Sequence, residues 1–377
     1  MFPTWRLSFP PTGHTLAPAS SRETMPPEPD PHRISLRDLA ARLGVSHATV
    51  SLALKGSPRI SAPVRERIIA LAEEVGYRPD PMLSALASYR RGKRSQPITA
   101  EVAWINAWPD PAQLRKHREF DFYWQGAFKA ADKFGFRLEE FHLGAECGPR
   151  RLHQILSTRG IRGILLPPHQ IEPDWQDFPW EHYSVVRFGR SLHHPACHIV
   201  TADQIANTIL AVQQIHAKGY RRIGFVTLEG DFSRRGMQFE LGFLGGQRII
   251  RDSEPIPVLV LTRTNPATRR KAFTTWLETY RPDAIVTPDP AIRQLLQQSG
   301  KSVPGDFGLA VTSVLDGGAD CGIDQHPEEI GRVGFLMLNS LISDRSTGIP
   351  AIFRQILVEG SWVDGQSLPN RTPPQDG

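Results

Sequence analysis

The chain has 377 residues and a formal net charge of +5 at pH 7, so it is long enough for more than one folded domain. No apolar run approaches the roughly 20 residues that a helix needs to span a bilayer, which argues against a membrane protein. Three cysteines, Cys147, Cys197 and Cys321, show no paired spacing, which argues against a disulfide framework and favours a reducing compartment.

The first 32 residues are rich in proline and have no continuous apolar core. We therefore expect residues 1–32 to form a disordered tail rather than a signal peptide, with Met25 as a second candidate start of translation. A cytoplasmic protein is the expectation.

Two short helices around a tight turn are predicted next, between residues 35 and 56. Ser35 can cap the first helix, and positions 36, 39, 40 and 43 form the i, i+3, i+4, i+7 stripe of one apolar face. Gly44 ends this helix, because glycine adopts the left-handed C-terminal conformation without steric cost. Ser46 caps the second helix. A turn of about three residues between two helices is the geometry that places the second helix in the DNA major groove.

A third helix is predicted at residues 63–75, followed by a short apolar segment at 81–88 and a basic run at 90–94. Residues 31–95 hold twelve Lys or Arg against five Asp or Glu, a local charge of +7, which leaves −2 for the rest of the chain. A basic small domain attached to a slightly acidic large one indicates a protein that contacts phosphate at one end, although a solvated charged face is the alternative.

These segments resemble the lactose-repressor (LacI/GalR) family of transcriptional regulators. The resemblance is carried by residues 36–40 (Leu-Arg-Asp-Leu-Ala), 44–51 (Gly-Val-Ser-x-x-Thr-Val-Ser) and 73–79 (Glu-Glu-Val-Gly-Tyr-Arg-Pro). It implies a helix-turn-helix domain at 33–79 and a hinge helix with linker at 80–98.

The resemblance also implies which side chains contact DNA. His47 and Ala48 occupy the positions that set base preference, and Leu52 stands where many relatives carry arginine. An exposed histidine without a role is the alternative for His47, and simple packing between two hinges is the alternative for the hinge leucines. The implied DNA-contact set is Ser46, His47, Ala48, Thr49, Ser51, Leu52, Lys55, Arg59, Leu83 and Leu86.

From about residue 99 the pattern alternates amphipathic helices with short apolar strands, which is typical of parallel sheets covered on both faces. Strands are predicted at 101–106, 137–143, 163–167, 222–228 and 284–287, and helices at 123–134, 149–159, 205–218 and 266–280. The order of these elements is similar to the two-lobed periplasmic-binding-protein architecture of the family. We expect this domain to span 99–365, to bind an effector and to dimerise, with a disordered tail at 366–377.

Ligands of open parallel sheets lie beyond the carboxyl ends of the strands, so candidate ligand residues follow strands or begin nearby helices. Asp203 and Asp289 match family positions that bond effector hydroxyls, although helix capping is the alternative for both. Phe239 replaces an arginine of many relatives, and Arg235 lies one turn away. The aromatic residues Tyr123 and Trp124 could stack on a sugar or pack in the core. The complete candidate set is Asn106, Tyr123, Trp124, Asp203, Arg235, Phe239, Asp289 and Gln325.

Two rival classes lack support in the sequence. An enzyme is disfavoured because the chain has no Gly-x-Ser-x-Gly, no phosphate loop and no dinucleotide fingerprint. The one metal-like cluster, at residues 193–198, is better explained as a solvated loop. A transport-linked binding protein would not need the helix-turn-helix domain at 33–79. We therefore expect a homodimeric regulator, a repressor by its family resemblance, that binds a near-palindromic DNA operator and a small-molecule effector such as a sugar. No catalysis, cofactor, metal or membrane is expected, and the expected location is the cytoplasm, in association with the nucleoid.

Overall fold

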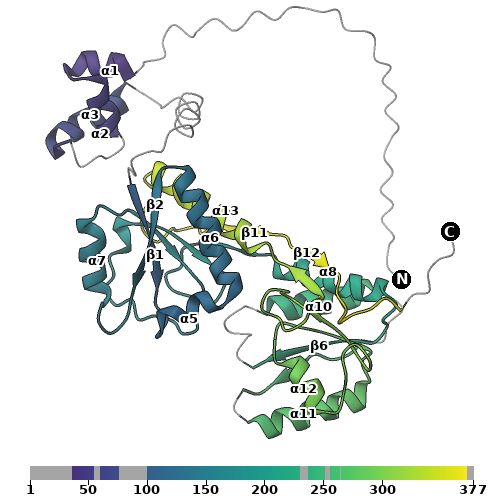
Figure 1. Cartoon of the computed structure of the whole chain (residues 1–377). Helices are drawn as coiled ribbons and strands as arrows, with labels where there is room; N and C mark the ends of the chain where they lie inside the picture. Colours follow the sequence, from purple (N-terminus) through teal and green to yellow (C-terminus); the bar gives the residue numbers. More distant parts are fainter. Residues whose placement is uncertain are drawn as a thin grey trace, which may run out of the picture. The chain divides into compact units, whose positions relative to one another are not determined.

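The computed structural model describes residues 36–54, 60–75, 100–229, 237–250, 255–263 and 265–371. It divides into two compact units, a small helical head and a large domain, which are described separately. Figure 1 shows the two lobes of the large domain, each built on its own sheet. No helix among the described residues is long and apolar enough to cross a membrane.

Three helices form the head: α1 (Leu36–Leu43), α2 (His47–Leu54) and α3 (Ala62–Glu74). Gly44 has a φ of +64° at the turn between α1 and α2, as its predicted role requires. Leu39, Val50 and Ile68 bring one buried side chain from each helix into a shared core. The three predicted helices are confirmed, and the third begins one residue earlier than expected.

Lobe 1 is a sheet of six parallel strands in the order β11-β5-β4-β3-β1-β2. Its strands are β1 (Ala100–Asn106), β2 (Phe136–His142), β3 (Gly163–Leu166), β4 (Ser184–Phe188), β5 (His198–Ala202) and β11 (Gln355–Val358). Its helices are α5 (Pro111–Lys116), α6 (Arg118–Lys133), α7 (Pro149–Thr158), η1 (Trp180–His182) and α13 (Pro327–Ser343). One apolar cluster packs α6 and α13 on one face of the sheet, and a second packs α7 on the other.

Lobe 2 repeats this plan with the strand order β12-β10-β9-β8-β6-β7, in which only the β10–β12 pairing is antiparallel. Its strands are β6 (Ile223–Leu228), β7 (Leu259–Leu261), β8 (Ala284–Thr287), β9 (Gly308–Val311), β10 (Gly322–Asp324) and β12 (Ser361–Val363). Its helices are α8 (Gln204–Ala217), α10 (Gln238–Ile249), α11 (Pro266–Tyr280) and α12 (Ile292–Gln298). Helices α8 and α10 pack on one face of the sheet and α11 and α12 on the other.

The chain passes between the lobes three times, between β5 and α8, between β10 and α13, and between β11 and β12. Each lobe therefore combines segments that are far apart in the sequence (Figure 1). Two such lobes with mostly parallel sheets form the predicted periplasmic-binding-protein-like architecture, and this prediction is confirmed.

Two helices of lobe 1 approach each other unusually closely. A Cβ atom added at Gly331 of α13 would lie 2.0 Å from the carbonyl oxygen of Tyr123 in α6. One added at Gly126 of α6 would lie 1.9 Å from the carbonyl oxygen of Glu328. Because only glycine permits such contact at both points, α6 and α13 pack as one rigid layer.

The end of the large domain differs from its prediction. The disordered tail expected from residue 366 is wrong for its first part, because Ser367 and Leu368 are buried in lobe 2. The Ser367 hydroxyl donates to the Leu309 carbonyl at 2.8 Å, and the Leu309 N–H donates to the Ser367 carbonyl at 2.8 Å. These contacts extend the folded domain to residue 371, and residues 372–377 lie outside the described part of the chain.

Candidate nucleic-acid interface and ligand site

The amino end of α2 is held by two hydroxyl side chains. Ser46 Oγ accepts a hydrogen bond from the Thr49 N–H at 3.0 Å and lies 2.8 Å from Thr49 Oγ1. Ser46 is therefore the cap that the sequence predicted. The N–H groups of the first turn and the partial positive charge at this end of the helix favour an anion. A DNA phosphate is such an anion.

The solvent side of α2 carries the residues predicted to read bases. His47 and Ala48 are exposed, while Val50 and Ala53 on the opposite side are fully buried in the head core. Thr49, Ser51 and Leu52 are half-buried at the border between the two faces. The residues predicted to read bases therefore lie on the exposed face of the helix or at its border. The predicted contacts Lys55, Arg59, Leu83 and Leu86 lie outside the described residues.

In lobe 1 the predicted ligand residue Asn106 ends β1 and is fully buried. Its Nδ2 donates to the Pro111 carbonyl at 3.0 Å and to Glu140 Oε1 at 2.8 Å, and its Oδ1 accepts from the Trp108 N–H at 2.9 Å. The amide therefore organises the turn after the strand and has protein partners at both donor positions.

The next residues tie neighbouring strand ends together. Ala107 N–H donates to His169 Nε2 at 2.8 Å, and Trp108 Nε1 donates to the Pro168 carbonyl at 2.9 Å. The His169 N–H in turn donates to Ser191 Oγ at 2.9 Å. Hydrogen bonds thus connect the carboxyl ends of β1, β3 and β4 into one rigid edge.

The two predicted aromatic ligands lie in the packing of lobe 1. Tyr123 is buried with its ring centroid 5.5 Å from that of Phe188, and Trp124 packs edge-on against Trp104 at 5.4 Å. This matches the core alternative that the sequence left open. A different aromatic group, Trp108 with His117 and Phe120, lies after β1, with the His117 and Phe120 centroids 5.1 Å apart. His117, which directly precedes α6, was not among the predicted aromatic ligands.

Asp203 and Asp289 both serve as local acceptors. Asp203 Oδ1 accepts from the Ala206 N–H at 3.0 Å and caps α8. Asp289 Oδ1 accepts from the Ala291 N–H at 3.0 Å, while the Asp289 N–H donates to Thr287 Oγ1 at 3.0 Å. The helix-capping alternative is confirmed for Asp203, whereas Asp289 closes a turn before α12, whose N-cap residue is Ala291.

One basic residue outside the candidate set interacts electrostatically with Asp203. Arg190 follows β4 and donates to Gln355 Oε1 at 2.7 Å. Burial and the neighbouring Arg187 lower the pKa of Arg190, and Asp203 opposes this shift. Its place after a strand, as for the other candidates, was the signal available in the sequence.

The remaining ligand candidates belong to lobe 2. Phe239 is buried in the same lobe 2 core cluster as Phe243. The position where many relatives carry arginine is therefore occupied here by a core residue. Gln325 is also buried, and its Nε2 donates to the Thr312 carbonyl at 2.7 Å. Arg235 lies outside the described residues.

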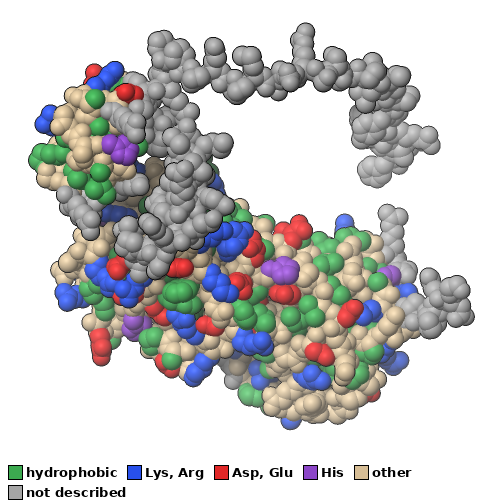
Figure 2. Space-filling model, turned by 45° about the horizontal axis from the view of Figure 1, so that its top comes forward, with side chains coloured by type: hydrophobic (Ala, Val, Ile, Leu, Met, Phe, Trp, Pro, Cys, Tyr) green, Lys and Arg blue, Asp and Glu red, His purple; other side chains and the backbone are tan. Residues whose placement is uncertain are grey.

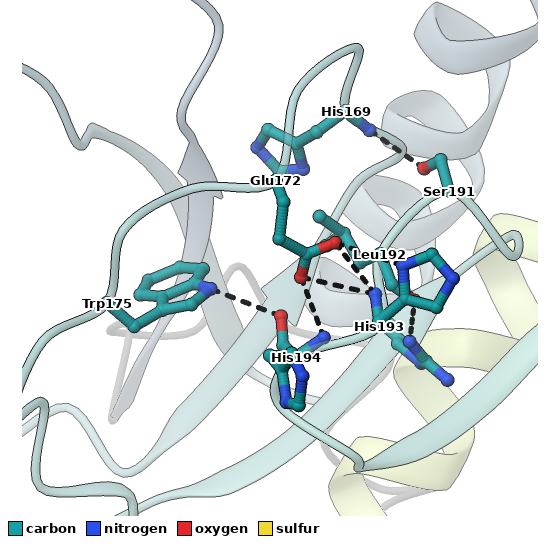
Figure 3. Close-up of polar contacts among 8 residues, drawn as sticks. His169, Glu172, Trp175, Ser191, Leu192, His193 and His194 are labelled. Carbon is teal, nitrogen blue, oxygen red and sulfur yellow. Dashed lines mark hydrogen bonds and ion pairs between the residues drawn. The ribbon is translucent and has the colours of Figure 1, made fainter. Parts of the chain in front are cut away.

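Figure 3 shows the histidine-rich loop, which is organised around one carboxylate. Glu172 accepts from the N–H groups of His193 at 2.9 Å and His194 at 2.7 Å, while Trp175 Nε1 donates to the His194 carbonyl at 3.2 Å (Figure 3). Burial raises the pKa of Glu172, but these hydrogen bonds outweigh it and hold the pKa below the usual 4.5. Burial also raises the pKa of Cys197 to about 12, so its thiol stays protonated at neutral pH. Within the described ranges no three His, Cys, Asp or Glu side chains are placed to hold a metal ion.

The outer surface of α6 carries two exposed phenylalanines, Phe128 at 47% and Phe134 at 43%. A groove of about 460 Å³ lies between α6 and the edge strand β2 and is lined by Phe128 and Trp124. A larger groove of about 680 Å³ runs along α6 and α13 and is lined by Phe134. On the face shown in Figure 2, Lys and Arg of the large domain alternate with Asp and Glu rather than forming one basic patch.

Residues 35–80 match the model of a family described as bacterial regulatory proteins, lacI family. An HTH-type transcriptional regulator of Mycolicibacterium smegmatis is 38% identical over 92 residues, which cover 24% of this chain and 25% of the relative. PtxS, an HTH-type transcriptional regulator of Pseudomonas plecoglossicida, is 28% identical over 212 residues, 54% of this chain and 57% of the relative. The chain therefore spans about a quarter and somewhat over half of these two relatives.

Among solved structures, the transcriptional regulator CelR in complex with cellobiose has a TM-score of 0.53 and 20% sequence identity. The match covers 89% of this chain and 100% of that chain. At this identity the likeness shows a common fold, in agreement with the two-lobed architecture described above.

Proposed function

We propose that the chain is a transcriptional repressor of the lacI family, whose model matches its head, and that it binds a near-palindromic operator as a dimer. The observation that carries this proposal is α2, which has a serine cap, an exposed His47–Ala48 pair and a fully buried opposite face. A helix of this construction can enter the major groove without exposing the head core. The catalytic alternative has no support, since both relatives named above are described as transcriptional regulators.

In the proposed complex the side chains divide into two roles. Ser46 and Thr49, at the amino end of α2, contact phosphate and fix the register of the head, with Lys55 and Arg59 adding charge. His47 donates to a guanine acceptor, and Ala48 offers a methyl contact to thymine. Ser51 and Leu52 lie at the edge of the interface, where Leu52 contributes apolar contact in place of a guanidinium.

The proposed test selects DNA fragments with the purified full-length chain and sequences the bound fraction. A near-palindromic motif is expected, and His47→Ala should change base preference at one position of each half-site. Glu66→Ala is the control, because Glu66 is exposed on α3 of the same head and does not belong to the proposed DNA-contact set. A uniform loss of affinity over all sequences in His47→Ala would instead assign His47 to phosphate contact.

The proposed hinge contacts are tested separately. The family resemblance places Leu83 and Leu86 in a hinge helix, where an apolar wedge enters a minor-groove step and bends the duplex. Leu86→Ala should weaken operator binding while the large domain stays folded. An unchanged affinity would show that the hinge does not enter the groove.

We place the second copy of the chain on the α6–β2 surface of lobe 1. Phe128 is nearly half exposed and stacks on Trp124 with centroids 6.1 Å apart, beside an edge strand that presents Arg137, Glu139 and Glu140. An apolar centre flanked by charges of both signs is self-complementary about a two-fold axis. Phe128→Glu should shift the protein to a monomer in analytical ultracentrifugation, whereas Phe353→Glu, an exposed site on lobe 1 at 46%, should not.

The large domain is proposed to bind a small-molecule effector at the carboxyl ends of its strands, with a sugar as the first class to test because CelR was solved with cellobiose. Asp203, Asp289 and Gln325 are the proposed polar contacts, and each carboxylate would use the oxygen that does not cap a turn. Calorimetric titration with a panel of mono- and disaccharides tests this. A ligand bound equally well by the wild type and by Asp289→Asn would exclude that carboxylate from the site.

A further inference from the structure

Helix α6 of lobe 1 begins without a cap of its own. Its N-cap residue is His117, whose side chain makes no capping hydrogen bond. The first turn of a helix has N–H groups with no partner inside the helix, and their partial positive charge favours a carboxylate. Such a group is normally supplied by a residue that immediately precedes the helix.

The missing acceptor comes from the other lobe. Asp316 lies in the segment between β9 and β10 of lobe 2, almost two hundred positions away in sequence. Its Oδ1 accepts from the Arg118 N–H at 3.2 Å and its Oδ2 from the Glu119 N–H at 3.1 Å. The Arg118 guanidinium also donates to the neighbouring Leu315 carbonyl at 3.3 Å. Both oxygens of the Asp316 carboxylate therefore cap the first turn of α6. The two segments are far apart in the sequence, so no short stretch of chain holds them together.

These contacts are separate from the covalent connections between the lobes. The crossings are held by local hydrogen bonds, such as Asp203 N–H to the Val358 carbonyl at 2.8 Å and Gly360 N–H to Asn207 Oδ1 at 2.7 Å. Movement about the three crossings can leave those bonds intact, but it must change the distance between Asp316 and α6. The bonds from α6 to Asp316 and Leu315 thus depend on the angle between the lobes, in contrast to the bonds at the crossings.

We propose that Asp316 is an interlobe latch, whose carboxylate supplies from lobe 2 the cap that α6 of lobe 1 lacks and so stabilises one relative position of the two lobes. Closure completes the first turn of α6, and opening leaves its N–H groups to water. Because α6 packs on α13 through Gly126 and Gly331, the latch fixes both helices together. The outer surface of α6, with Phe128 and Phe134, therefore moves as a unit relative to lobe 2.

The latch is tested by Asp316→Ala and Asp316→Asn in the full-length chain. Asp110→Ala is the matched control, because Asp110 caps α5 inside lobe 1 through the Ala112 N–H at 3.1 Å and bridges no lobes. Hydrogen exchange reports each cap locally, with faster exchange expected at Arg118 and Glu119 in Asp316→Ala and at Ala112 in the control. Folding of each variant is verified from the exchange of the central strands.

The interlobe distance is the decisive readout, because a purely local cap would not change it. Spin labels on Arg150→Cys in lobe 1 and Lys271→Cys in lobe 2, both exposed, are placed in a Cys147→Ser background, since Cys197 and Cys321 are buried. Asp316→Ala should move the closed–open ratio toward open by about fivefold, the usual effect of removing a cap, and Asp316→Asn by less. Asp110→Ala should leave the distribution unchanged. An unchanged distribution in Asp316→Ala, or an equal shift in the control, would overturn the proposal, and neither result depends on DNA or effector binding.

Discussion

The head and the large domain differ in how their functional side chains are used. In the head, His47 and Ala48 project into solvent from a helix whose other face is buried, so they are available to a partner. In the large domain, Asn106, Asp203 and Asp289 sit at strand ends but already accept or donate hydrogen bonds within the protein. A surface helix leaves its contact residues free, whereas a site built from turns must first use its polar groups to hold those turns.

The difference should appear most strongly when each unit is destabilised alone. Gly331→Leu places side-chain atoms where the Tyr123 carbonyl lies, so we expect the large domain to lose about 3 kcal/mol or more of unfolding free energy. The head should keep its own transition in calorimetry, because it is a separate compact unit. Gly148→Ala, at a position with open space around it, is the control. Loss of both transitions together would show that the two units fold cooperatively.

The reciprocal change is Leu39→Ala in the head. Leu39 is fully buried among the three helices, so its truncation should cost about 2–5 kcal/mol and unfold the head at lower temperature. Affinity for every DNA sequence should fall, while the calorimetric transition of the large domain stays in place. His47→Ala is the comparison, since it should change base preference without changing the stability of the head. Equal destabilisation by the two variants would contradict the assignment of faces on α2.

Two helix caps allow a direct comparison between the units. Ser46→Ala in the head and Asp203→Ala in lobe 2 each remove an acceptor from a helix start, at a cost of about 1 kcal/mol. Urea unfolding, followed separately by probes of the head and of lobe 2, should show each loss only in its own unit. If Asp203→Ala also abolished effector binding while stability fell by this small amount, Asp203 would be both a cap and a ligand.

The smallest expected effect concerns the Glu172 loop. The pKa of Glu172 is below its ordinary 4.5 in the folded protein, so its carboxylate contributes stability above pH 4.5 that is lost as the pH falls through the folded value. Glu172→Gln should therefore lower the urea midpoint of the large domain at pH 7 and have less effect near pH 4. Glu181→Gln, which removes an exposed carboxylate 3.9 Å from His182, is the control and should leave the urea midpoint at pH 7 nearly unchanged. A constant difference between Glu172→Gln and wild type over this range would mean that its charge is unimportant.

Local sequence signals were sufficient for the head. Ser46, Gly44 and the buried positions of α1 and α2 are separated by a few residues, so spacing alone defines the helices, the turn and the exposed face. In the large domain, local signals also placed α11 and β8 at their observed bounds. They missed the start of α6 at Arg118, because the acceptor that closes its first turn, Asp316, comes from another lobe.

The candidate ligand residues show the limit of this reasoning. Position after a strand correctly indicated where Asn106 and Asp289 lie, but not that Pro111, Glu140 and Ala291 would engage them. The role of Phe239 in the lobe 2 core and the burial of Leu368 also depend on neighbours distant in sequence. Sequence by itself determined the helix-turn-helix, its solvent face and the alternation that produces two parallel sheets, because these follow from periodicity within one element. Only the tertiary structure decided which polar groups remain available and which lobe caps α6, because hydrogen-bond partners in a two-lobed fold come from segments that the chain brings together through its three crossings.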